Sequence, residues 1–212
     1  MVNYFIMVST KPQYNIISKM KTITLLWLLI AFVGCSNSTP KTKISAQNNI
    51  GTILNVYNLD NLKFLLNRNI NELECIQYPM GVSLKDTIFE SEDETQWKGL
   101  VFYKKTVALL FVETSWENVT IVKRITVLNS DIIGIQGLRI GAKFVDIKSL
   151  LSQTIPTYPD GYLGLKVKND NQVTCFFNII NNQNLGVGNV AFEAIPEDLV
   201  VAQILIEQDT KH

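Results

Sequence analysis

An uncharged apolar run between Lys21 and Cys35 limits what this chain can fold into more than any other feature. The run extends from Thr22 to Gly34 and is rich in leucine and isoleucine. It is too short for the ~20 apolar residues with which a helix crosses a bilayer. A lysine before a short apolar core, with small residues after it, is typical of an export signal. We therefore expect residues 1–34 to be a leader and signal peptide that does not join the folded body.

The export signal fits a start at Met20 better than a start at Met1. From Met20 the signal has the usual length, whereas residues 1–19 form a long leader that contains Pro12 and several polar residues. The alternative interpretation makes Ile23 to Val33 a buried helix or an uncleaved anchor.

The signal ends in Phe32-Val33-Gly34-Cys35, which resembles the lipobox of bacterial lipoproteins. The resemblance implies cleavage between Gly34 and Cys35 by lipoprotein signal peptidase and attachment of lipid, palmitate included, to Cys35. Phe32 departs from the leucine that is usual in this family. Ser36 resembles the residue that follows the cysteine in lipoproteins sorted to the outer membrane. The resemblance thus implies a lipid-anchored protein of the bacterial outer membrane, facing the periplasm, with surface display as an alternative.

Beyond the signal the chain divides into a tether and a body. Residues 35–48 are mostly small and polar, which predicts a flexible tether behind the lipidated cysteine. The chain as a whole is 47% hydrophobic and 18% charged, which is the composition of a globular protein. We expect one globular α+β domain over residues 49–209, with halves at 49–130 and 131–209.

Charge and histidine content narrow the chemistry. Removing residues 1–34 takes away three lysines and no carboxylate, which leaves 16 basic against 19 acidic side chains. This balance disfavours nucleic-acid binding, which depends on Lys and Arg to neutralise phosphates. The only histidine is His212, the last residue, so no imidazole inside the body is available as a general base or metal ligand. We expect no cofactor and no metal.

Apolar spacing predicts helices packed on an antiparallel sheet. Helical spacing occurs between Asn58 and Ile76 and between Ala142 and Ser152. Strand-like segments are 100–103, 106–113, 119–129, 162–168, 172–180 and 200–207. Strict alternation would place one set of strand side chains against the second helix, with Val173, Cys175, Phe177, Val200, Ala202, Ile204 and Ile206 facing Phe144, Ile147, Leu150 and Leu151.

The two halves share an order of parts. A helix over Ile70 to Ile76 precedes strands in the first half, as a helix over Phe144 to Leu151 does in the second. This order indicates a tandem helix-plus-meander repeat. The alternative is that two α+β halves match by chance.

The segment between the halves carries a family resemblance. Gly137-Leu138-Arg139-Ile140-Gly141 runs into Phe144-Val145-Asp146-Ile147. This opening resembles that of small periplasmic lipoprotein domains of the barrel-assembly accessory and β-lactamase-inhibitor-like type. The resemblance implies a helix on an antiparallel sheet and a binding module rather than a catalyst.

Two cysteines remain in the body, Cys75 and Cys175. The oxidising compartment beyond an export signal favours a disulfide between them. The alternation around Cys175 favours an unpaired thiol that packs as a small apolar residue. Both interpretations stay open.

Candidate binding residues are aromatic side chains that flank expected strand breaks, where exposed rings anchor partners. They are Trp97, Trp116, Tyr158 and Tyr162, and the alternative is that they cover the edges of the core.

The predicted function is non-catalytic binding of a protein or envelope component. One alternative is a hydrolase of envelope glycans with two catalytic carboxylates, and another is a periplasmic inhibitor or immunity protein.

Overall fold

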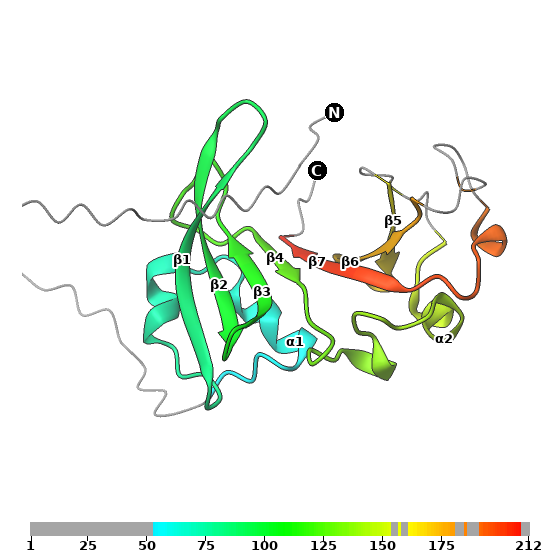
Figure 1. Ribbon diagram of the computed structural model, residues 1–212, viewed down its shortest axis with the longest axis horizontal. Helices are drawn as coiled ribbons and strands as arrows, with labels where there is room; N and C mark the ends of the chain where they lie inside the picture. Colours follow the sequence, from blue (N-terminus) through cyan, green and yellow to red (C-terminus); the bar gives the residue numbers. More distant parts are fainter. Residues whose placement is uncertain (1–52, 154–156, 158–160, 181–184, 186–190, 209–212) are drawn as a thin grey trace, which may run out of the picture. The chain divides into compact units, whose positions relative to one another are not determined.

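The computed structural model describes residues 53–153, 157, 161–180, 185 and 191–208. A seven-stranded antiparallel sheet passes through them in the order β1-β2-β3-β4-β7-β6-β5 (Figure 1). Its strands are β1 (Val82–Glu90), β2 (Gln96–Lys104), β3 (Val107–Glu113), β4 (Arg124–Val127), β5 (Tyr162–Val167), β6 (Asp170–Asn178) and β7 (Val201–Glu207). The antiparallel sheet of the expected fold class is confirmed. The first half of the body supplies four strands and the second half three, and they meet where β4 pairs with β7.

The helices are shorter than the sequence predicts. They are α1 (Leu59–Leu62), η1 (Lys63–Leu65), η2 (Ile70–Cys75), η3 (Ile135–Gly137), α2 (Phe144–Ile147), η4 (Lys148–Leu150) and η6 (Phe192–Ala194), where η denotes a 3₁₀ helix. Asn58 begins α1, because its side-chain oxygen accepts from the N–H groups of Asp60 and Asn61. Within the described ranges, no helix has the length and apolar character needed to cross a membrane.

Strand β1 is absent from the sequence prediction. It pairs along its length with β2 and lies at the edge of the sheet, and most of its side chains are exposed or half-buried. Lys85 and Asp86 stand in its middle, as charged residues often do on edge strands. They break the apolar alternation by which a strand is identified in a sequence.

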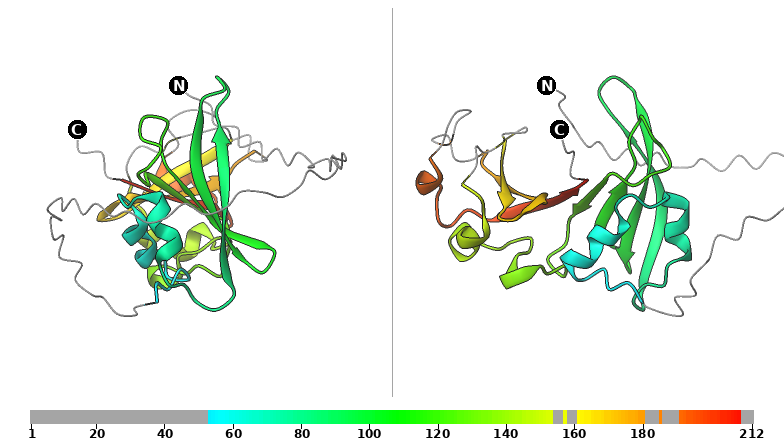
Figure 2. Two further views of the ribbon diagram at one scale, coloured as in Figure 1. Left: turned by 90° about the vertical axis from the view of Figure 1, so that its left-hand side faces the viewer. Right: turned by 180° about the vertical axis from the view of Figure 1, so that it is seen from behind.

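One face of the sheet and the helical segments contribute to the same buried cluster. The cluster includes Leu100, Phe102, Leu110, Val112, Ile125 and Val127 from the first half, and Val173, Cys175, Phe177, Ile204 and Ile206 from the second. Leu59, Leu62, Leu65 and Ile147 from the helical segments belong to it as well. The segment that contains α1 and η2, drawn in cyan, lies beside the green strands (Figure 2). The ring of Phe144 meets that of Phe177 edge to face, with centroids 5.9 Å apart.

The expected frame of β7 is wrong at its start. Ile204 and Ile206 are buried as predicted, but Val200 is 45% exposed and Ala202 is only half-buried. Val201 faces the core instead of Ala202. Phe176 pairs with Gln203 and the next residue, Phe177, pairs with Val201, so the pairing skips Ala202. The extra residue in β7 is a β-bulge, which reverses the alternation.

The two cysteines form no disulfide. Cys75 is a free, exposed thiol at the end of η2, and Cys175 is a free, buried thiol on β6. Burial raises the pKa of Cys175 to about 12, so this thiol packs as an apolar group and not as a reactive one.

The frame of β7 can be tested by truncation. We expect Ile204→Ala and Ile147→Ala each to lower the free energy of unfolding by ~2–5 kcal/mol, because each empties a packed aliphatic site. Gln203→Ala, on the opposite face of β7, should change it by no more than ~0.5 kcal/mol. Urea denaturation of the three variants measures these differences. Equal losses at Ile204 and Gln203 would show that the frame is wrong.

Candidate ligand-binding pocket

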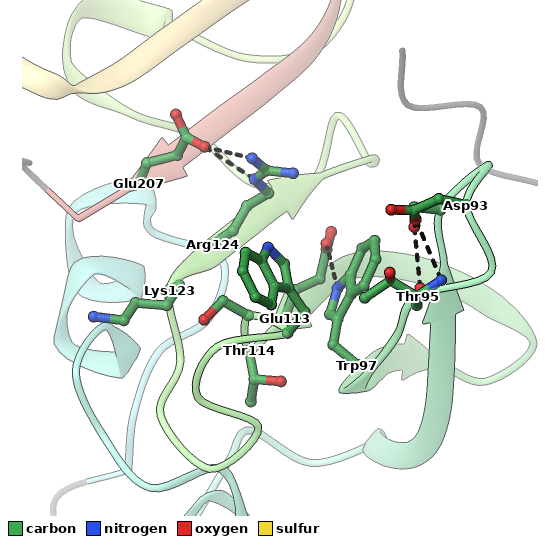
Figure 3. A pocket seen from close by; sticks show the side chains of 11 residues that line it. Asp93, Thr95, Trp97, Glu113, Thr114, Lys123, Arg124 and Glu207 are labelled. Carbon is green, nitrogen blue, oxygen red and sulfur yellow. Dashed lines mark hydrogen bonds and ion pairs between the residues drawn. The ribbon is translucent and has the colours of Figure 1, made fainter. Parts of the chain in front are cut away.

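A cavity of about 380 Å³ opens where several strands of the sheet begin or end (Figure 3). The β1–β2 loop and the loop after β3 supply part of its lining, and β2, β3, β4 and β7 supply the rest. Neighbouring antiparallel strands alternate in direction, so the ends of β3 and β7 lie beside the starts of β2 and β4. The lining residues are Ser91, Asp93, Thr95, Trp97, Glu113, Thr114, Ser115, Trp116, Lys123, Arg124 and Glu207.

Strand register builds a row of charges across the pocket. Glu113 on β3 is directly opposite Arg124 on β4, which is directly opposite Glu207 on β7. The guanidinium of Arg124 donates to the Glu207 carboxylate from Nε and Nη2, each at 2.9 Å from Oε1 (Figure 3). Opposite charges at directly paired positions stabilise an antiparallel sheet. The row ties the end of the last strand to the first half of the body.

Glu113 is the buried charged residue of this row, with only 3% of its surface exposed. The indole N–H of Trp97 donates to its carboxyl, with 3.3 Å between Nε1 and Oε2, and the Thr126 hydroxyl lies 3.5 Å from Oε1. Figure 3 shows the Trp97 ring and the Glu113 side chain pointing toward one another. Burial raises the pKa of Glu113 above its ordinary value, and the Arg124 guanidinium and the two hydrogen bonds oppose this effect only in part.

The other ionisable side chains of the pocket also have partners. Asp93 accepts hydrogen bonds from the Ser91 hydroxyl and from the Thr95 N–H, and these bonds lower the pKa of Asp93. Lys123 donates to the side-chain oxygen of Gln208. In the part of the chain that the structure describes, no group of three or more potential ligands could hold a metal ion.

An aromatic cluster supports the pocket from the same face of the sheet. The rings of Phe89 and Trp97 stack with centroids 6.2 Å apart, and Phe111 meets Phe89 edge to face. Gly99 makes this arrangement possible, because a Cβ there would lie 2.2 Å from a carbon of the Phe89 ring. Phe89 thereby lies across β2 and fixes the orientation of Trp97.

The structure brings two of the four predicted aromatic residues together. Trp97 and Trp116 line the same pocket, Trp97 largely buried and Trp116 63% exposed. Tyr162 lies on β5, at the opposite edge of the sheet from β1. Tyr158 lies outside the described residues, as do Gly34 and Cys35. Sequence reasoning missed Glu113, Arg124 and Glu207, although opposite charges at the ends of neighbouring strands are a signal that could have found them.

Comparison with known proteins finds little. No protein-family model matches the chain, and no curated protein matches it. Among solved structures, it is similar to the crystal structure of the uncharacterized protein yfeY from Escherichia coli. The TM-score is 0.46 and the identity 16%, over 74% of this chain and 100% of that chain. What this chain does must therefore be inferred from its own side chains.

The buried carboxyl of Glu113 predicts a pH effect. Its pKa is higher in the folded chain than in the unfolded chain, so the stability it contributes is complete below the ordinary value of 4.5 and is lost as the pH rises through the folded value. We expect wild type to lose stability relative to Glu113→Gln as the pH rises above the ordinary value of 4.5, because the amide cannot ionise. Urea denaturation of both proteins as a function of pH measures the difference. A difference independent of pH would contradict the assignment.

Proposed function

We propose that this protein is a lipid-anchored lipoprotein of the bacterial outer membrane that binds a cell-envelope component in the pocket around Trp97 and Trp116. The observation that carries the proposal is that these two tryptophans line one cavity. Both were candidate anchors from the sequence alone. The cavity volume of about 380 Å³ falls in the range of small-molecule sites, about 300–1,000 Å³.

The state of the charged groups supports binding rather than catalysis. Glu113 is engaged by Trp97 and Thr126, Glu207 by Arg124, and Asp93 by Ser91 and Thr95. Side chains fixed by neighbours present an unchanging set of donors and acceptors, which favours recognition at little entropic cost. An inhibitor or immunity protein would differ from this proposal only in its partner.

One observation favours the hydrolase alternative. Glu113 is a buried carboxyl with a raised pKa inside a cavity, and such a group can act as a general acid. Glycoside hydrolysis needs a second carboxylate as base or nucleophile. Glu207 and Asp93 line the same cavity, but each is held by the partners named above. We therefore keep binding as the proposal and hydrolysis as its rival.

We also propose a repeated architecture, in which helical segments pack on the sheet in each half. In both halves one α-helical turn continues directly into a 3₁₀ turn, as α1–η1 and α2–η4. Lys63, Leu65 and Leu66 have counterparts in Lys148, Leu150 and Leu151. This match pairs Leu59–Leu66 with the second helix, in place of the expected Ile70–Ile76. Each half then contributes its last strand, β4 or β7, to the middle of the sheet.

Anchor and pocket can be tested by reciprocal variants of the tagged full chain. We expect Cys35→Ser to leave the membrane fraction or stay unprocessed, because the lipid anchor is lost, and to keep its capacity to capture an envelope component.

We expect Trp116→Ala to stay with membranes and to capture that component at least about tenfold more weakly, as at a binding hot spot. Fractionation, in-cell crosslinking and mass spectrometry supply the readouts.

Phe64→Ala is the matched control, because Phe64 is also an exposed aromatic residue but does not line the pocket. A processed Cys35→Ser protein that still sediments with membranes would contradict the anchor. Equal capture by Trp116→Ala and wild type would contradict the pocket.

A further inference from the structure

The side chains that line the pocket indicate which class of ligand it would bind. This inference rests on the proposed function. Among the described lining residues, the large apolar surfaces are the indole rings of Trp97 and Trp116. Around them lie the hydroxyl groups of Ser91, Thr95 and Ser115, whereas Thr114 is buried and its hydroxyl donates to the Lys98 carbonyl. A pyranose ring has the complementary form, with C–H groups on its faces and hydroxyl groups around its rim. An indole face packs on the C–H groups, and polar side chains bond the rim.

The charges of the pocket favour a neutral ligand. Arg124 is bound to Glu207 and stands opposite Glu113, and Lys123 donates to Gln208. The lining thus holds two cationic side chains, Lys123 and Arg124, against three carboxyl groups, those of Asp93, Glu113 and Glu207. The lining therefore has no excess of positive charge with which to attract a phosphate or another polyanion. Partnered carboxylate and guanidinium groups still have lone pairs and N–H groups to offer to hydroxyl groups.

The position of the pocket disfavours a peptide. An extended peptide binds by adding a strand to a free sheet edge or by placing apolar side chains in a groove. Four of the strands that line the pocket, β2, β3, β4 and β7, are interior strands whose edges are paired on both sides. The indole surfaces are flanked by hydroxyl and charged groups rather than by aliphatic side chains, which suits a hydroxylated ligand better than an aliphatic side chain.

We propose that this pocket binds a neutral oligosaccharide, with the exposed ring of Trp116 stacked on one sugar unit and with the hydroxyl, carboxylate and guanidinium groups of the lining bonded to its rim. Trp97 forms the inner wall, held in place by Phe89 and Glu113. Trp116, being 63% exposed, is free to take part in ligand binding without loss of the core.

Tryptophan fluorescence can test this proposal directly. The chain has three tryptophans, Trp27, Trp97 and Trp116. In the full chain with Trp27→Phe, all tryptophan emission comes from the pocket. We expect chitotetraose or maltotetraose to change this emission saturably, whereas inorganic phosphate and tetra-alanine do not.

Variants assign the binding to the ring. Trp116→Ala should weaken oligosaccharide binding at least about tenfold, while Trp116→Phe should retain most of it and Phe64→Ala all of it. Calorimetry supplies the affinity of Trp116→Ala, and urea denaturation shows that this variant is folded.

The outcomes of these experiments separate an error in the ligand class from an error in the proposed function. A response to phosphate or tetra-alanine in place of the sugars, or no response to either sugar, would overturn the ligand class. If capture of an envelope component still depended on Trp116 in that case, the proposed function would stand. Cleavage of the bound sugar, detected by mass spectrometry, would support the ligand class and contradict the non-catalytic function.

Discussion

The pairing of β4 with β7 is the interaction on which the rest of the structure depends. β4 closes the strands of the first half, and β7 comes near the end of the chain. Their four paired positions place Ile125 opposite Ile206 and Val127 opposite Ile204, all fully buried. Without this contact there would be two small sheets, each with a further unpaired edge. With it, one cluster of buried side chains spans both halves.

The same pairing also completes the pocket. Alternation along β4 turns Ile125 and Val127 to the core and Arg124 and Thr126 to the opposite face. On that opposite face, Glu113, Arg124 and Glu207 come into register, and Thr126 reaches the carboxyl of Glu113. The second half therefore contributes to a site that is otherwise built by the first half. The buried core and the pocket therefore depend on the same short strand pair.

The parts of the fold that the sequence predicts are those set by local pattern. The strand over 107–113, the hairpin of β5 and β6 and the helical turns at 59–65 and 144–150 all follow from apolar spacing. Edge strand β1 does not, because the charges in its middle interrupt that spacing. The bulge in β7 does not either, because one extra residue reverses which side chains face the core.

The site is predicted only in part for a similar reason. Trp97 and Trp116 stand out as aromatic residues near strand breaks, so composition and position suffice to find them. Glu113 gains its role from Arg124, which lies opposite it on the next strand, and from Trp97, whose N–H it accepts. Opposite charges at the ends of neighbouring strands suggest such a pair, but a single sequence does not fix the register that places these residues opposite one another. The signal and lipobox-like segment at Cys35 lie outside the described residues and stay predictions.

Native-state hydrogen exchange of the full chain tests most directly whether the β4–β7 pair unites the two halves. If it does, the slowest amides of β4 and β7 should exchange only through global unfolding, with the same free energy as the slowest amides of β3 and β6. Both halves should then lose protection together as denaturant is added. Exchange of β4 and β7 at a clearly lower free energy, with β3 and β6 still protected, would show that the halves fold separately and would contradict this account.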